Sequence, residues 1–235
     1  MHAGMVNLCL NRCIWKLGPM TTIRNSVTQQ IFATPVWIVD LAPEYADGLN
    51  ERLMTAIETL MGPLPPLAGG RTNWQTDPNL HRLPQFAEVV RLFEEAGRAA
   101  ADYLKLASKD LAVTGCWANV NPPGGHNPSH SHPNNYLSGV YYVSIPEGEG
   151  RIAFEDPRVQ AQVMLPPVAE LTPYNGNIVT FEAKPGRLLV FPAWLGHSVP
   201  TNRSPHNRIS MSFNLMFRNY AEELSAPLWK GATSA

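Results

Sequence analysis

The sequence has few cysteines, no long apolar run and no cluster of basic residues. Its 3 cysteines, at positions 9, 13 and 116, form an odd and sparse set, which excludes a disulfide framework and favours a reducing cytoplasm. No apolar stretch approaches the roughly 18 residues that a membrane span requires, so we expect no membrane partner. Lys and Arg total 18 against 19 for Asp and Glu, without a dense basic run, which argues against a nucleic-acid partner.

The remaining composition is that of an ordinary globular protein, with 44% hydrophobic and 16% charged residues in a chain of 235. Residues 1–19 are mildly apolar and basic, but they contain neither a clear hydrophobic signal region nor a cleavage site. The sequence from Met20 reads like a normal protein start. We therefore expect residues 1–19 to be a non-structural extension and residues 20–235 to form a single domain.

Helical patterns come first in the chain and provide support over about 43–106. Apolar residues recur at helical spacing over 43–61 and 85–106, and Pro43 suits the first turn of a helix. The stretch 62–83 is rich in Gly and Pro and is expected to be a loop. An opening strand is expected over 31–40.

From residue 115 the pattern changes to short strands separated by Pro, Gly and Asn. At least six such strands with hairpin-like spacing indicate an antiparallel barrel or sandwich. The sequence thus predicts a mainly β protein with flanking helices and a β-barrel core at about 115–217. The predicted strands cover residues 115–121, 136–146, 150–155, 177–183, 187–192 and 207–217.

Several histidines of the β half are candidate metal ligands. His130 and His132 form an H-x-H pair, and residues two apart in an extended chain point to the same side. His197 follows a later predicted strand, and a barrel can bring it to the same place. Imidazole binds iron, zinc, copper and nickel. The pair alone is equally compatible with ordinary core or surface histidines, and His126 is a further candidate in a Gly/Pro-rich loop.

The last predicted strand places Arg208 among polar residues. Strict alternation puts Arg208, Ser210 and Ser212 on one face and apolar residues on the other. If the polar face looks into the barrel, the buried guanidinium needs an anionic partner. It can bind a carboxylate through two parallel hydrogen bonds, with a serine supplying a third. The alternative is a structural Arg–Glu pair.

Together these motifs resemble the iron(II)- and 2-oxoglutarate-dependent oxygenases. The closest resemblance is to a group of uncharacterised oxygenases of this superfamily with prolyl-hydroxylase-like motifs. It implies a double-stranded β-helix, the jelly roll of cupin-like proteins, with iron(II) as metal and 2-oxoglutarate as co-substrate. The resemblance covers most of residues 30–217, and it is carried by the segments HSHPNNYLSGVYYV, GRIAFEDPR, PGRLLVFPAWLGHSVPTN and RISMSFN.

The resemblance also implies the metal ligands. His130 matches the first ligand of the family's H-x-D/E pair, and His197 matches its distal histidine. The chain departs from the pattern at His132, where the superfamily has Asp or Glu. We predict His130, His132 and His197 as ligands, with Glu155 or Asp156 as an alternative to His132 for the third.

The same resemblance implies the co-substrate residues. Arg208 and Ser210 match the residues that hold the far carboxylate of 2-oxoglutarate, and Tyr142 falls where a tyrosine shares that carboxylate. Asn119 is expected to reach the near end of the co-substrate or the substrate. No catalytic residue is expected beyond the metal ligands, and the prolyl-hydroxylase-like motifs indicate a hydroxylase.

Other functions and partners stay open in the sequence. One alternative is a cupin-like metalloenzyme that does not use 2-oxoglutarate, and another is a non-catalytic barrel that binds a ligand. The substrate is expected to be a small molecule or a peptidyl or amino-acid group, and a homodimer is possible. The irregular segments 62–83 and 156–176 are candidate lids, because long connections near a site often close over it.

Overall fold

The computed structural model of the chain describes residues 27, 28 and 30–220. The chain divides into two compact units, Met1–Pro35 and Val36–Ala235. The described part of the first unit forms no helix. The expected extension at residues 1–19 lies outside the described residues, so it stays a prediction. The second unit carries the helices, the sheets and the predicted site.

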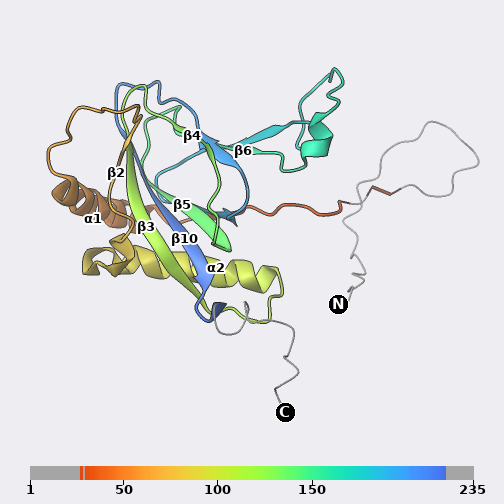
Figure 1. Ribbon diagram of the computed structural model, residues 1–235. Helices are drawn as coiled ribbons and strands as arrows, with labels where there is room; N and C mark the ends of the chain where they lie inside the picture. The colour runs from red at the N-terminus through yellow and green to blue at the C-terminus, as the bar shows by residue number, and fades with distance from the viewer. Residues whose placement is uncertain (1–26, 29, 221–235) are drawn as a thin grey trace, which may run out of the picture. The chain divides into compact units, whose positions relative to one another are not determined.

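The second unit is built on a six-stranded antiparallel sheet with the strand order β1-β8-β5-β10-β3-β2. The long strands β3 and β10 lie side by side through its middle (Figure 1). The strands are β1 (Trp37–Asp40), β2 (Trp74–Gln75), β3 (Leu111–Asn121), β5 (Leu137–Ser144), β8 (Arg187–Pro192) and β10 (Arg208–Phe217).

A second, four-stranded antiparallel sheet has the order β4-β9-β6-β7. From β3 onward the chain passes back and forth between the two sheets, with β6 and β7 as a pair in the smaller sheet, as in a jelly roll, so the predicted fold class is confirmed. An inner core of apolar side chains includes residues from both sheets, among them Tyr142 and Phe154. The strands are β4 (Asn127–His130), β6 (Ile152–Glu155), β7 (Ile178–Phe181) and β9 (His197–Val199).

Two α-helices, α1 (Pro43–Met61) and α2 (Ala87–Tyr103), pack against the larger sheet. Proline starts α1, and Gly62 ends it at a φ of 58°, which glycine adopts without steric cost. Three short 3₁₀ helices complete the fold: η1 (Leu80–Arg82), η2 (Pro84–Phe86) and η3 (Val159–Gln162). Among the described helices, none combines the length and the apolar character that crossing a membrane requires.

The predicted alternation of β10 is confirmed. Its apolar residues face the helices, where Phe213 stacks on Phe93 of α2 with ring centroids 3.9 Å apart. Gly97 allows α2 to approach the sheet closely, because a Cβ atom there would lie 2.6 Å from Leu215. The polar residues of β10 face the opposite side, toward the smaller sheet, and this is the side that carries the candidate site.

Some elements differ from the sequence prediction. The opening strand begins only at Trp37, and the predicted loop 62–83 contains β2 and η1. Strands β4 and β9 were not predicted, since they have four and three residues and the first is rich in polar residues and Pro. These short elements are strands because other segments of the chain pair with them. Such pairing cannot be recognised from local periodicity.

Candidate metal and co-substrate site

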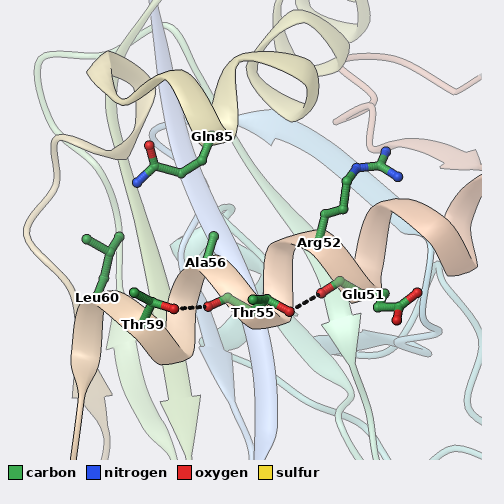
Figure 2. A pocket seen from close by; sticks show the side chains of 7 residues that line it. All are labelled: Glu51, Arg52, Thr55, Ala56, Thr59, Leu60 and Gln85. Atoms are coloured by element: carbon green, nitrogen blue, oxygen red, sulfur yellow. Dashed lines mark hydrogen bonds between the residues drawn. The ribbon is translucent and has the colours of Figure 1, made fainter.

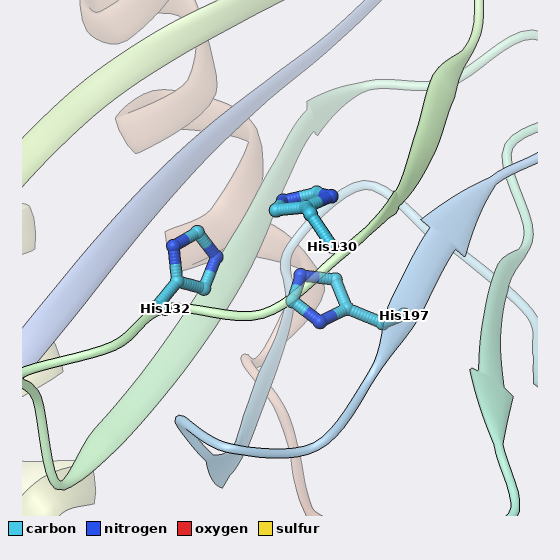
Figure 3. A group of neighbouring side chains, drawn as sticks. All are labelled: His130, His132 and His197. Atoms are coloured by element: carbon cyan, nitrogen blue, oxygen red, sulfur yellow. The ribbon is translucent and has the colours of Figure 1, made fainter.

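Three histidines converge at one end of a cavity between the two sheets. His130 ends β4 and His197 begins β9, and these residues are paired in register across the two strands. His132 lies two residues beyond His130, where its backbone N–H donates to the carbonyl of Ala193 at 2.8 Å. One ring nitrogen of each imidazole lies within 4.8 Å of the others, so all three can hold one ion (Figure 3).

Local hydrogen bonds prepare two of these imidazoles as ligands. Nδ1 of His130 lies 2.8 Å from the carbonyl oxygen of Pro128, and Nδ1 of His197 lies 2.9 Å from that of Leu195. A carbonyl only accepts hydrogen bonds, so each Nδ1 carries the proton and each Nε2 keeps its lone pair for a metal. The surroundings also fix the charge: burial lowers the pKa of both His132 and His197 to about 4, so both are neutral near pH 7.

Aromatic rings surround the cluster. The rings of Phe191 and Phe154 lie 4.8 and 6.0 Å from the ring of His197, and the Trp117 indole lies 5.7 Å from His132. This wall restricts the imidazoles to few orientations. His130 is exposed, whereas His197 is 5% exposed, so the cluster lies at a mouth that opens to solvent on one side.

The alternative carboxylate ligands do not join the cluster. Both carboxylate oxygens of Asp156 are held by the Arg158 side chain at 2.9 and 2.8 Å. Phe154 is paired with His197, and Glu155 follows it, so alternation turns the Glu155 side chain to the other face of the sheet. His126 is also absent from the cluster. Among the described residues, the histidines alone form a group that can hold a metal.

A buried cation lies at the other end of the cavity. Arg208, the first residue of β10, is 2% exposed. Its Nη1 donates to the hydroxyl of Ser210 at 3.0 Å and to Oδ1 of Asn121 at 3.4 Å, but its Nε has no hydrogen-bond partner. No ion pair of the described residues includes Arg208, so the alternative of a structural Arg–Glu pair is wrong.

Tyr142 lies beside this cation. The guanidinium carbon of Arg208 is 5.3 Å from the centroid of the tyrosine ring, and the buried hydroxyl has no hydrogen-bond partner. Burial raises the pKa of Tyr142 to about 12, so the phenol stays protonated near pH 7 and can donate. Two buried donors without partners at one place can both donate to a ligand that accepts hydrogen bonds.

A polar wall joins the two ends of the cavity. Nε2 of Gln75 donates to Oδ1 of Asn119 at 2.7 Å, and Nδ2 of Asn119 donates to Oγ of Ser212 at 2.9 Å. All three residues line the cavity, as do the histidines and Arg208. Sequence reasoning placed Asn119 here but missed Gln75, because Gln75 lies in a stretch that has no periodicity.

A larger groove, of about 530 Å³, lies on the outer face of α1 (Figure 2). Its threonines already donate within the helix, Thr55 to the carbonyl of Glu51 at 3.0 Å and Thr59 to that of Thr55 at 2.7 Å. The groove contains no histidine, cysteine or buried charge. It therefore offers no chemistry comparable with that of the cavity between the sheets.

The cavity between the sheets thus combines three imidazoles that can hold one metal ion with a buried guanidinium that can bind an anion. Residues 115–214 match the model of a family described as "Putative 2OG-Fe(II) oxygenase". This segment runs from β3 into β10 and contains every predicted ligand and co-substrate residue. This segment of the chain is therefore similar to a 2OG-Fe(II) oxygenase domain, a class that uses iron(II) and 2-oxoglutarate. No curated protein sequence matches the chain significantly.

Solved structures share the fold. An oxidoreductase of the 2OG-Fe(II) oxygenase family from Burkholderia pseudomallei is 16% identical, with a TM-score of 0.53, over 76% of this chain and 84% of that one. A prolyl-4-hydroxylase from Pseudomonas putida is 16% identical, with a TM-score of 0.52, over 79% and 94%. HygX from Streptomyces hygroscopicus, with nickel and 2-oxoglutarate bound, is 12% identical, with a TM-score of 0.54, over 79% and 84%.

Proposed function

We propose that this protein is an iron(II)- and 2-oxoglutarate-dependent hydroxylase in which His130, His132 and His197 hold the metal. The cluster supports this assignment, because three ring nitrogens within 4.8 Å of one another suit a single ion. Two Nδ1 atoms already donate to backbone carbonyls, which presents Nε2 toward the cluster. Three protein ligands on one side of an octahedral ion leave positions for a chelating co-substrate and for dioxygen.

The observation that carries the proposal is the unpaired Arg208. A buried guanidinium without a carboxylate is costly unless a ligand supplies the anion. The hydroxyls of Ser210 and Tyr142 lie beside it, and the three together match the far carboxylate of 2-oxoglutarate. The same cavity is lined by the histidines, which supports binding of the other end of the molecule near the metal. A metalloenzyme that does not use 2-oxoglutarate has no need of this arginine.

The chemistry divides between the metal and the chain. Bound iron(II) would couple activation of dioxygen to oxidative decarboxylation of 2-oxoglutarate, giving succinate, carbon dioxide and a hydroxylated substrate. Arg208, Ser210 and Tyr142 orient the co-substrate, and the aromatic wall around His197 excludes water from that side. The exposed side at His130 is where we propose that substrate arrives.

We propose a peptidyl or amino-acid group as the substrate. The structural likeness to a prolyl-4-hydroxylase and an accessible mouth support this class. Trp194, which is 57% exposed, lies in the turn that leads to His197 and offers an aromatic surface beside the mouth. The buried free thiol of Cys116 fits a reducing compartment, so we propose a cytoplasmic location.

The co-substrate assignment is tested by titrating 2-oxoglutarate into the iron(II) protein without oxygen. Chelation of the metal by the keto acid is expected to give a weak visible charge-transfer absorption. Arg208→Met removes the charge-assisted hydrogen bonds. It is expected to weaken the binding of 2-oxoglutarate about 100-fold, since such bonds contribute about 1.5–3 kcal/mol each. Arg187→Met is the control, because Arg187 begins β8, pairs with the exposed Asp40 and does not line the cavity.

Succinate release under oxygen completes this experiment. Arg208→Met is expected to lose co-substrate turnover, while Arg187→Met retains it. The proposal is wrong if the wild-type protein gives no absorption and no succinate, or if Arg208→Met releases succinate at the wild-type rate and the wild-type concentration dependence.

A further inference from the structure

The side-chain hydrogen bonds of the polar wall run in one order, from donor to acceptor across the sheet, and the metal and co-substrate assignments do not explain this order. The wall crosses three neighbouring strands, because Gln75 of β2 is paired with Asn119 of β3, and Asn119 is paired with Ser210 of β10. The side-chain bonds run the same way, from the Gln75 amide to Asn119 and from Asn119 to Ser212. Each step passes from a donor to an acceptor toward the middle of the cavity.

The order of donors and acceptors determines which polar atoms of the wall remain free to bond with a ligand. Oγ of Ser212 accepts from Asn119 and Oγ of Ser210 accepts from Arg208, so both hydroxyl protons stay free to donate. Asn119 has used its oxygen on Gln75 and keeps one N–H of its amide. The wall between the histidines and Arg208 therefore presents donors to the cavity, as a dianionic co-substrate requires.

The orientation of Asn119 depends on its neighbour. An amide can turn over and exchange its oxygen and nitrogen, and only its hydrogen bonds decide between the two arrangements. Turned over, Asn119 would direct its oxygen at Ser212, whose hydroxyl would then donate to it and be lost to the ligand. In the structure Gln75 donates to the Asn119 oxygen and Asn119 donates to Ser212, and this arrangement leaves the Ser212 proton free.

We infer that Gln75 is a positioning residue, which orders the Asn119 amide so that Asn119 and Ser212 donate to 2-oxoglutarate between the metal and Arg208. This inference rests on the proposed function. Gln75 itself is exposed and belongs to a two-residue edge strand outside the matched family segment. It acts on the co-substrate through Asn119.

The test is Gln75→Met, which keeps the length of the side chain and removes the donor. We expect the KM for 2-oxoglutarate to rise about 3- to 10-fold, because one hydrogen bond to a charged group is weakened. We expect kcat to stay within about twofold, since the metal ligands are untouched. The anaerobic charge-transfer titration is expected to show the same loss of affinity, and the band is expected to move because a donor near the chelated carboxylate has changed.

The matched control is Gln85→Met. Gln85 lines the groove beside α1 (Figure 2), and this groove shares no lining residue with the cavity between the sheets. It is expected to leave the KM, kcat and the absorption band unchanged. Gln75→Glu is a second variant: a carboxylate accepts only, so it would turn the Asn119 amide over and is expected to raise the KM more than Gln75→Met does.

The outcomes separate the two claims. An unchanged KM and an unmoved band in Gln75→Met, with normal 2-oxoglutarate binding in the wild type, would overturn the role of Gln75 alone. A loss of kcat and melting temperature without a KM effect would also overturn it, since that pattern indicates a structural residue. If the wild-type protein does not bind 2-oxoglutarate at all, the proposed function fails first.

Discussion

The two ends of the cavity differ in exposure, charge and hydrogen bonding. At the histidine end the side chains range from exposed to 5% exposed, and two Nδ1 atoms are already satisfied by backbone carbonyls. At the arginine end the charge is 2% exposed, and the side chains of Arg208 and Tyr142 each keep one buried polar atom without a partner. The hydrogen bonds of the first end orient its imidazoles, whereas those of the second end leave buried donors unpaired.

This difference indicates how the site divides its work. The histidine end is held by the chain's own hydrogen bonds, so it can admit an ion and still face solvent, the side from which we propose that substrate arrives. The arginine end keeps groups that reduce the stability of the ligand-free protein, as functional sites often do. Ligand binding would satisfy those groups and stabilise the fold by mass action.

The largest expected effect comes from removing a ligand at the histidine end. His130→Ala is expected to abolish tight metal binding and all release of succinate, since two imidazoles cannot replace three on one ion. His130 is exposed, so the fold should survive its truncation. Bound iron, measured by elemental analysis after anaerobic loading, should fall to the background.

The control for this change is His126→Ala. The backbone carbonyl of His126 accepts from Thr72 at 2.6 Å, a bond that does not depend on the His126 side chain, and His126 is absent from the cluster. Its variant should load iron as the wild type does. Equal metal loading in both alanine variants would show that the ion, if bound, lies elsewhere.

A smaller effect is expected from His132→Asp, which gives the neutral histidine end one negative charge. Three neutral imidazoles leave the charge of the ion uncompensated, so the dianionic co-substrate should tighten metal binding strongly. A carboxylate at position 132 supplies one negative charge, so metal should bind better alone and gain less from 2-oxoglutarate. We expect the enhancement by 2-oxoglutarate to fall about 10-fold, within the usual range of coupling between sites.

Isothermal titration of manganese(II), with and without 2-oxoglutarate, measures this coupling without turnover. His132→Asn changes the ligand atom without adding charge and therefore should not show the improved binding of metal alone. An enhancement in His132→Asp as large as that of the wild type would refute the charge argument.

The contrast between the ends also bears on how far the sequence could be read. The alternation of β10 revealed Arg208 and Ser210, because a period of two along one strand is a local signal. The H-x-H pair was visible because its two histidines are separated by one residue in the sequence. Gln75 was not, because its role arises from the pairing of β2 with β3, which joins residues 44 positions apart in the chain.

Residues that depend on the smaller sheet were equally hidden. The polar segment that ends at His130 is a strand because it pairs with β9, and the sequence predicted no strand there. The exclusion of Glu155 and Asp156 likewise required three-dimensional information. Composition permitted either carboxylate, whereas the Arg158 contact and the register of β6 remove them from the cluster.

The smallest expected effect concerns two adjacent tyrosines of β5 that face opposite sides of the sheet. The Tyr141 hydroxyl donates to Oδ1 of Asn50 at 2.8 Å beneath α1, whereas the Tyr142 hydroxyl is buried without a partner in a residue whose ring lies beside Arg208. Tyr142→Phe should raise the KM for 2-oxoglutarate about 3- to 10-fold and leave the melting temperature equal or higher, because it removes an unsatisfied buried group. Tyr141→Phe should lower the melting temperature, by leaving Asn50 unsatisfied, and leave the KM unchanged. Thermal unfolding and succinate assays on the pair decide the point: a Tyr142→Phe protein that loses stability but keeps its KM would mean that this hydroxyl holds the fold together instead of awaiting a carboxylate.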